Sequence, residues 1–95
     1  MVFKKLEEAS FSFLGKEIKQ NPARSFSSHS WECNKGLWFV CVSAYPIMSN
    51  KANITIHLGD ALILGRSKEL SEDQVTSIEE LISESESLIK DTFRV

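Results

Sequence analysis

Apolar residues recur at intervals of three and four positions through the last quarter of the chain, from about Ser71 to Phe93. At about 100 degrees per residue, this spacing gathers them on one side of an α-helix, while the acidic residues fall on the other side. The pattern therefore predicts a long amphipathic helix that packs on an apolar surface. Its apolar arc consists of Val75, Ile78, Leu81, Ile82, Leu88, Ile89 and Phe93.

Two signals place the start of this helix at Ser71. Gln74 follows Ser71 by three residues, which is the capping-box pattern. Leu70 and Val75 stand at the two positions of a hydrophobic staple. We therefore expect a helix over residues 71–93.

Two segments that contain aromatic residues, 25–33 and 37–45, flank a short polar loop. The loop, 34–36, ends in glycine, which suits the last position of a three-residue hairpin loop. This geometry predicts a β-hairpin in which Cys33 lies opposite Leu37.

The predicted register divides the hairpin's side chains between two faces. One face resembles a core and holds Trp31, Cys33, Leu37, Phe39 and Cys41. The other face holds Phe26, Ser28, Ser30, Glu32, Trp38, Val40 and Val42. One helix cannot cover both faces, so Trp38 predicts a second apolar surface, covered by the N-terminal segment or by a second protomer.

Residues 53–58 alternate between aliphatic and polar side chains, as a half-buried strand does. Gly59 and Asp60 can turn the chain into the apolar segment 61–65 and close a second hairpin. A continuous strand bulged at Gly59 fits the pattern nearly as well.

The first twenty residues fit two patterns. Residues 3–9 have the spacing of a short helix, whereas residues 10–19 alternate as a strand that turns at Gly15. The sequence favours a short helix followed by a strand. Residues 19–25 are expected to form a loop because Pro22 disfavours helix in the residue before it.

Together these elements predict one α+β domain over residues 1–95, since the chain is about as long as a single domain. We expect a small two-layer architecture. In this architecture, the C-terminal helix packs on a mostly antiparallel sheet of four or five strands. A short N-terminal helix is a second candidate to pack on the sheet.

The composition is that of an ordinary globular protein, with 42% hydrophobic and 25% charged residues. The longest apolar run, 37–42, is far shorter than the roughly 20 residues of a membrane-spanning helix. The N-terminal segment lacks the apolar run of a signal peptide. We expect a protein of the reducing cytoplasm, with no membrane partner.

In the predicted register, Cys33 and Cys41 are about 13 Å apart at roughly 3.3 Å per residue. That distance excludes a disulfide and a shared zinc ion. His29 would lie opposite Cys41, as in a nucleophile-base pair, but no orienting third group or oxyanion hole can be located. The sequence therefore predicts no enzyme activity and no catalytic, cofactor-binding or metal-binding residues.

Charge is distributed unevenly along the chain. Residues 71–95 carry seven acids against two bases, a net charge of −5, whereas residues 1–24 have a net charge of +2. An acidic helix face can attract a basic partner. The residues expected to bind a partner lie on this face and on the sheet: Trp38, Glu79, Glu80, Glu84 and Asp91.

The leading functional hypothesis is a non-catalytic, intracellular protein-protein interaction module, such as a small inhibitor, an immunity-type protein or an adaptor. Its partner would be a protein, basic if the helix binds it, and a homodimer is left open. The first alternative is nucleic-acid binding through sheet aromatics, although residues 25–70 have a net charge of only +1. The second is a small enzyme or ligand-binding subunit whose site, with His29, Cys41 or His57, forms on oligomerisation.

Overall fold

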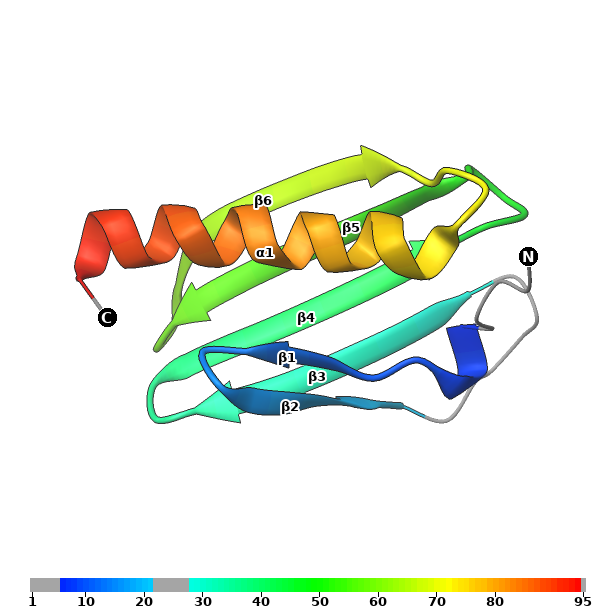
Figure 1. The fold of residues 1–95 in the computed structure, drawn as a ribbon. Coiled ribbons are helices and arrows are strands. Elements are labelled where there is room, and N and C mark those ends of the chain that lie inside the picture. The colour runs from blue at the N-terminus through cyan, green and yellow to red at the C-terminus, as the bar shows by residue number, and fades with distance from the viewer. Residues whose placement is uncertain (1–5, 22–27, 95) are drawn as a thin grey trace.

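The computed structural model describes residues 6–21 and 28–94. In this part of the chain, a six-stranded antiparallel sheet curls around one long helix (Figure 1). The α+β prediction is confirmed, but the sheet has six strands instead of four or five. In chain order the elements are β1 (Phe11–Phe13), β2 (Lys16–Gln20), β3 (His29–Lys35), β4 (Trp38–Tyr45), β5 (Lys51–Leu58), β6 (Ala61–Glu69) and α1 (Gln74–Phe93).

The N-terminal α-helix is absent from the described residues, where Leu6–Glu8 form only one 3-10 turn. Residues 3–5 of that predicted helix, and 22–25 of the predicted loop, lie outside the described residues. Within 10–19 the chain forms strands, as the alternating pattern predicts. In this conformation Phe11, Phe13 and Ile18 are buried on one face of the sheet. The predicted turn at Gly15 is confirmed, and it joins β1 to β2.

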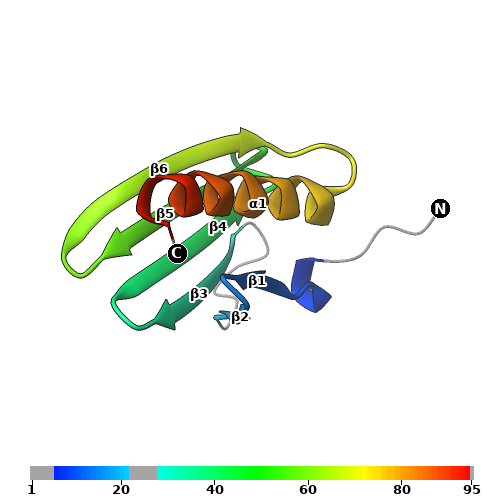
Figure 2. The same ribbon diagram turned by 60° about the vertical axis from the view of Figure 1, so that its left-hand side comes forward.

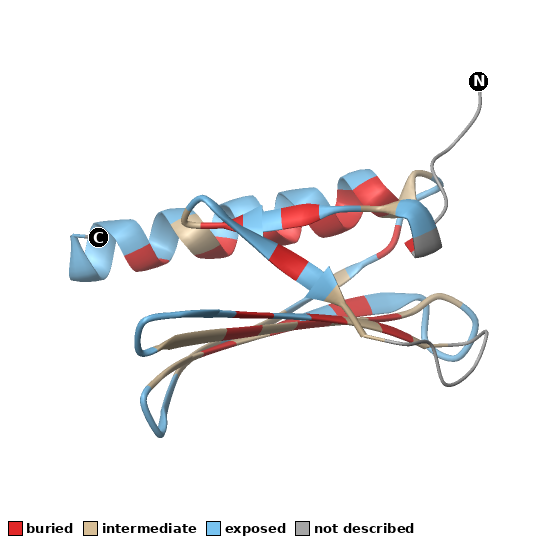
Figure 3. Cartoon of the chain, turned by 90° about the horizontal axis from the view of Figure 1, so that it is seen from below, coloured by how far each residue is buried: buried red, intermediate tan, exposed pale blue. Residues whose placement is uncertain are grey.

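Each strand pairs with the next in sequence, from β1 to β6. The sheet curls so strongly that β1 returns to the side of α1 (Figures 2 and 3). At this edge, the backbone N–H of Leu14 donates a hydrogen bond of 2.7 Å to Glu86 Oε1. At the other edge, Arg66 on β6 forms an ion pair of 3.3 Å with Glu84. Both edges of the sheet therefore hold the helix.

The core lies between α1 and the concave face of the sheet (Figure 3). Trp31 is fully buried, and its ring meets that of Phe11 edge-on at a centroid distance of 5.2 Å. Five of the seven residues in the predicted helical arc are buried. The exceptions, Leu88 and Phe93, are 44% and 38% exposed.

The predicted register of the central hairpin is wrong. Cys33 lies opposite Val40, and a two-residue turn at Gly36-Leu37 replaces the three-residue loop. Gly36 has a φ of 59°, so the glycine begins the turn instead of ending it. The partner of Cys33 moves by three positions, an odd number, which exchanges the faces of one strand relative to the other.

This shift places Trp38 on the same concave side as Trp31, Val40 and Val42. Phe39 and Cys41 face the convex side instead. The second apolar sheet face predicted around Trp38 therefore does not exist. Trp38 is covered in part by the helix, since the Phe93 ring meets its ring at a centroid distance of 5.3 Å.

The second predicted hairpin is confirmed, with β5 and β6 joined by Gly59 and Asp60. The alternative of one strand bulged at Gly59 is wrong. A register irregularity does occur, but between Ile56 and His57, where Ile63 is the extra residue of β6.

Helix α1 begins three residues later than predicted. Asp73 is the N-cap, and its Oδ1 accepts a hydrogen bond of 3.0 Å from the backbone N–H of Thr76. Ser71 does not cap the helix, because its hydroxyl lies 2.7 Å from that of Ser77. Ser77 and Ser85 are also buried, which the apolar spacing alone could not show.

Both cysteines are free thiols, as predicted, but the distance argument was wrong. Cys41 follows Val40, the residue opposite Cys33, so the two backbones are close while the side chains point to opposite faces. Burial raises the pKa of both thiols.

We expect both cysteines to react slowly with iodoacetamide at neutral pH, because only the thiolate is nucleophilic. Reaction should accelerate as the pH rises through the alkaline range. Cys41, which is half-buried, should react faster than the buried Cys33. Mass spectrometry of timed samples measures both rates, with the unfolded chain as the control, and an intrachain cross-link in the native protein would contradict the fold.

Candidate functional site

Three hairpin turns and the C-terminal end of α1 meet at one end of the molecule (Figure 1). A cavity of about 720 Å³ opens there, which we call the turn-end pocket. The residues that line it are Leu14, Gly15, Lys35, Gly36, Leu37, Trp38, Leu58, Glu86 and Lys90. Its size lies in the range of cavities that bind small molecules or partner side chains.

Trp38 is the largest side chain in the turn-end pocket. It is the first residue of β4, and its side chain lies on the concave face of the sheet. Its ring is half-buried, and Leu37 beside it is 73% exposed at the tip of the β3–β4 turn. The pocket therefore presents apolar side chains to solvent.

Hydrogen bonds tie the three turns together. Lys35 Nζ donates to the carbonyl of Leu14, which links the β3–β4 turn to the β1–β2 turn. The N–H of Gly59 donates to the carbonyl of Leu37 at 2.9 Å, which links the β5–β6 turn to the β3–β4 turn. The frame of the pocket is thus cross-connected by contacts between residues far apart in sequence.

Leu14 holds an unfavourable backbone conformation in this frame. Its φ of 50° is in the left-handed region, which costs a non-glycine residue about 1–2 kcal/mol. The cost is offset by its N–H bond to Glu86 and by the contact of its carbonyl with Lys35. Strained residues of this kind are concentrated at functional sites.

Among the described residues that line the turn-end pocket, the charged groups are two lysines and one carboxylate. Glu86 accepts the Leu14 N–H, and its Oε1 also lies 3.8 Å from Lys90 Nζ. Lys35 uses one of its three ammonium donors on the Leu14 carbonyl. The pocket therefore has a net formal charge of +1.

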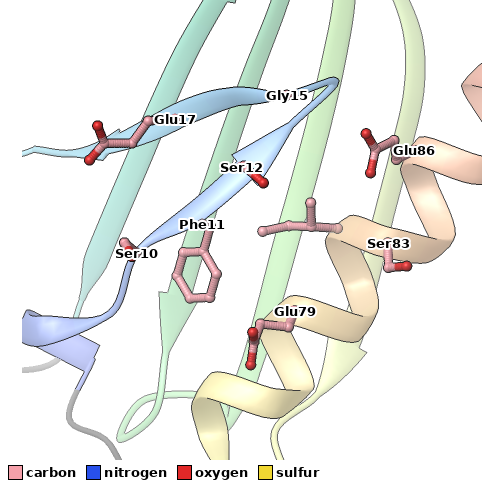
Figure 4. A pocket seen from close by; sticks show the side chains of 9 residues that line it. Ser10, Phe11, Ser12, Gly15, Glu17, Glu79, Ser83 and Glu86 are labelled. Carbon is pink, nitrogen blue, oxygen red and sulfur yellow. The ribbon is translucent and has the colours of Figure 1, made fainter.

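A second cavity, of about 590 Å³, lies between the β1–β2 hairpin and α1, and we call it the acidic cavity (Figure 4). It shares Gly15 and Glu86 with the turn-end pocket. Glu79 and Glu86 project from the side of α1 that faces β1 (Figure 4), and Glu17 completes the acidic lining. No lysine or arginine is among the described residues that line it.

The structure separates the predicted partner-binding residues onto three surfaces. Trp38 lies in the turn-end pocket and Glu79 in the acidic cavity. Asp91 is exposed near the end of α1 and has no ion pair within residues 6–21 and 28–94. Glu80 and Glu84 lie on the side of α1 that faces β6.

Glu80 and Glu84 are occupied by ion pairs within the chain. Lys68 Nζ lies 3.2 Å from Glu80 and 3.4 Å from Glu84, and Arg66 also binds Glu84. The hydrogen bond with Glu80 is the main cause of a raised pKa at Lys68. These two carboxylates hold the helix to β6, so they are poorly placed to attract a partner.

Changing both Glu80 and Glu84 to lysine is therefore expected to weaken the fold. The change would replace three ion pairs with repulsion between four cations. We expect a lower melting temperature than wild type at low salt and a smaller difference at high salt, because salt screens exposed charges. The control is Glu72→Lys with Asp91→Lys, two reversals at exposed positions without ion pairs in the described structure. Equal melting temperatures for the two variants would contradict this role.

The residues considered for catalysis are not brought together. His29 lies opposite Ala44, and Cys41 lies opposite Glu32, so the predicted His29–Cys41 pairing is wrong. His57 is on the convex face near Phe39, at a centroid distance of 6.1 Å between the rings. The described residues contain no group of three or more histidine, cysteine or acidic side chains that could hold a metal ion.

No helix among the described residues covers the convex face of the sheet (Figure 3). Its aromatic residues include Phe39 and Tyr45 but neither tryptophan. The strand registers place two carboxylates and two lysines on this face, from Glu32, Glu69, Lys19 and Lys51. A nucleic acid stacked on these aromatics would meet few cations to neutralise its phosphates.

Most of the turn-end pocket has no signal in the sequence. Leu14, Lys35, Leu37 and Lys90 belong to different elements, and no local pattern connects them. One available signal was glycine at the centre of each hairpin turn, which indicated three turns but not that they meet at one end.

No helix among the described residues is long and apolar enough to cross a membrane. Comparison of the chain with protein-family models, with curated proteins and with solved structures found no match in any of the three.

Proposed function

We propose that this protein is a non-catalytic interaction module that binds a partner protein through the turn-end pocket. The observation that carries the proposal is the exposed apolar surface around Trp38, assembled from three hairpin turns and the end of α1. Inhibitors and adaptors are the kinds of protein that work in this way. The two free thiols suit a reducing compartment such as the cytoplasm.

The arrangement of apolar residues supports this proposal. Phe93, 38% exposed, packs on Trp38, and Leu37 extends the apolar surface at 73% exposure. Exposed apolar residues that form one contiguous surface usually mark an interface, and tryptophan is enriched among interface residues that dominate binding energy. A frame of cross-linked turns also lowers the entropy lost when a partner binds.

A second candidate is a basic partner bound at the acidic cavity. Glu17, Glu79 and Glu86 line this cavity without a lysine or arginine among its described lining residues. A cationic side chain from a partner would be attracted there. Because the two cavities share Glu86, one partner could reach both.

Site-specific photo-crosslinking in the native host tests the choice of surface. The photoreactive residue p-benzoylphenylalanine would replace Leu37 at the rim of the turn-end pocket, and Leu62 as a control. Leu62 is similarly exposed, at 60% against 73%, but lies opposite His57 on the convex side. A third probe would replace Ser83 in the acidic cavity.

We expect the Leu37 probe to capture a distinct protein that the Leu62 probe does not. Capture only from Ser83 would move the site to the acidic cavity and support the second candidate. Capture only from Leu62, or only of a second copy of this chain, would contradict binding of a partner protein at the turn-end pocket.

A further inference from the structure

We propose that the partner inserts a large apolar side chain with a carboxylate beside it into the turn-end pocket. This inference rests on the proposed function and adds the chemistry of the bound segment. It is carried by Lys35 and Lys90, which line a cavity whose other described side chains are apolar except for Glu86.

The two lysines have unused binding capacity. Lys35 donates to the Leu14 carbonyl and retains two ammonium donors. Lys90 is 53% exposed, and its separation of 3.8 Å from Glu86 is long for a hydrogen bond. The Glu86 carboxylate accepts a hydrogen bond of 2.7 Å from the backbone N–H of Leu14, so it already binds a group within the chain.

The charges around the pocket leave its net charge of +1 unchanged. Lys16 begins β2 beside the β1–β2 turn, and Arg94 follows Phe93 at the end of α1. With Lys35 and Lys90 they make four cations around the turn end, against the acids Asp60, Glu86 and Asp91, a net charge of +1. The complete chain has a net charge of −2, so the turn end is a positive region on an acidic protein.

The apolar side chain of the proposed partner is inferred from the residues that line the pocket. Trp38, Leu14 and Leu58 offer aromatic and aliphatic surface, and the cavity of about 720 Å³ has room for more than one side chain. A carboxylate beside the apolar group would meet Lys35 or Lys90. A cationic group there would meet like charge, which is unfavourable in a partly desolvated site.

Three short synthetic peptides test this inference. They are acetyl-Gly-Phe-Asp-Gly-amide and the two peptides in which asparagine or lysine replaces the aspartate. Binding would be followed through the indole N–H signal of Trp38 in NMR spectra. The indole of the fully buried Trp31 is the internal reference.

We expect the aspartate peptide to bind about tenfold more tightly than the lysine peptide at low salt, with the asparagine peptide between them. High salt should reduce the difference. Lys35→Gln should reduce it as well, whereas Lys51→Gln on the convex face should leave it unchanged.

Equal binding of the three peptides, tighter binding of the lysine peptide, or no shift of Trp38 with any peptide would overturn the inference. These outcomes are separate from the test of the proposed function. Capture of a protein through the Leu37 probe does not depend on the charge of the bound segment.

Discussion

Replacing Trp31 with alanine is expected to lower the free energy of unfolding by about 3–5 kcal/mol. Trp31 is fully buried at the centre of β3, and its ring contacts Phe11 on β1. Truncation would leave a large cavity and would also remove the contact through which the curled edge of the sheet packs on its centre. Chemical denaturation followed by circular dichroism measures the loss.

Trp31→Phe is the matched variant. The Trp31 indole N–H has no hydrogen-bond partner within the described part of the chain. Phenylalanine therefore removes an unsatisfied buried donor while it keeps most of the aromatic packing, and we expect a loss of about 1–2 kcal/mol. Leu62→Ala, at an exposed site, should change stability by less than about 0.5 kcal/mol. A Trp31→Ala loss as small as that of Leu62→Ala would contradict the placement of Trp31 in the core.

Replacing Trp38 with alanine is expected to weaken partner binding by about 30-fold or more, which corresponds to at least about 2 kcal/mol. The reason is that Trp38 is the largest apolar side chain among the described residues that line the turn-end pocket. The loss of stability should be smaller than for Trp31→Ala, because the Trp38 ring is only half-buried. Titration calorimetry with the captured partner gives the affinity.

Leu62→Ala is again the control, since it removes exposed apolar surface on the convex side. Its affinity for the partner should equal that of wild type. If Trp38→Ala binds as well as wild type while Leu62→Ala does not, the partner uses the convex face and the proposed site is wrong.

Much of the fold follows from patterns within single elements. The helical arc predicts α1 because five of its seven apolar residues bury themselves against the sheet. The alternation in 53–58 and the turn at Gly59 likewise predict β5, β6 and their connection. These features depend on local spacing, which is present in the sequence.

The register of the central hairpin depends on tertiary contacts instead. Glycine at position 36 suits the end of a three-residue loop and the start of a two-residue turn equally well. In the structure, β3 continues through Asn34 and Lys35. Lys35 then reaches the carbonyl of Leu14, a contact with a segment twenty-one residues away in sequence. Local sequence propensity cannot predict that contact.

The site was predictable only in part. Trp38 was identified as an interface residue, but for a sheet face that does not exist. The acids of the helix also look alike in sequence. Only the position of Arg66 and Lys68 beside α1 distinguishes Glu84, which is paired, from Glu79, which is not paired within residues 6–21 and 28–94.

The most direct test of the central claim is an NMR spectrum of the protein with and without its captured partner. The chain has two tryptophans, so two indole N–H signals are expected, and Trp31→Phe assigns them. We predict that the Trp38 signal shifts or broadens on binding while the Trp31 signal stays in place. An unchanged Trp38 signal, together with shifts at Phe39 and Thr55 on the convex face, would show that the partner binds elsewhere.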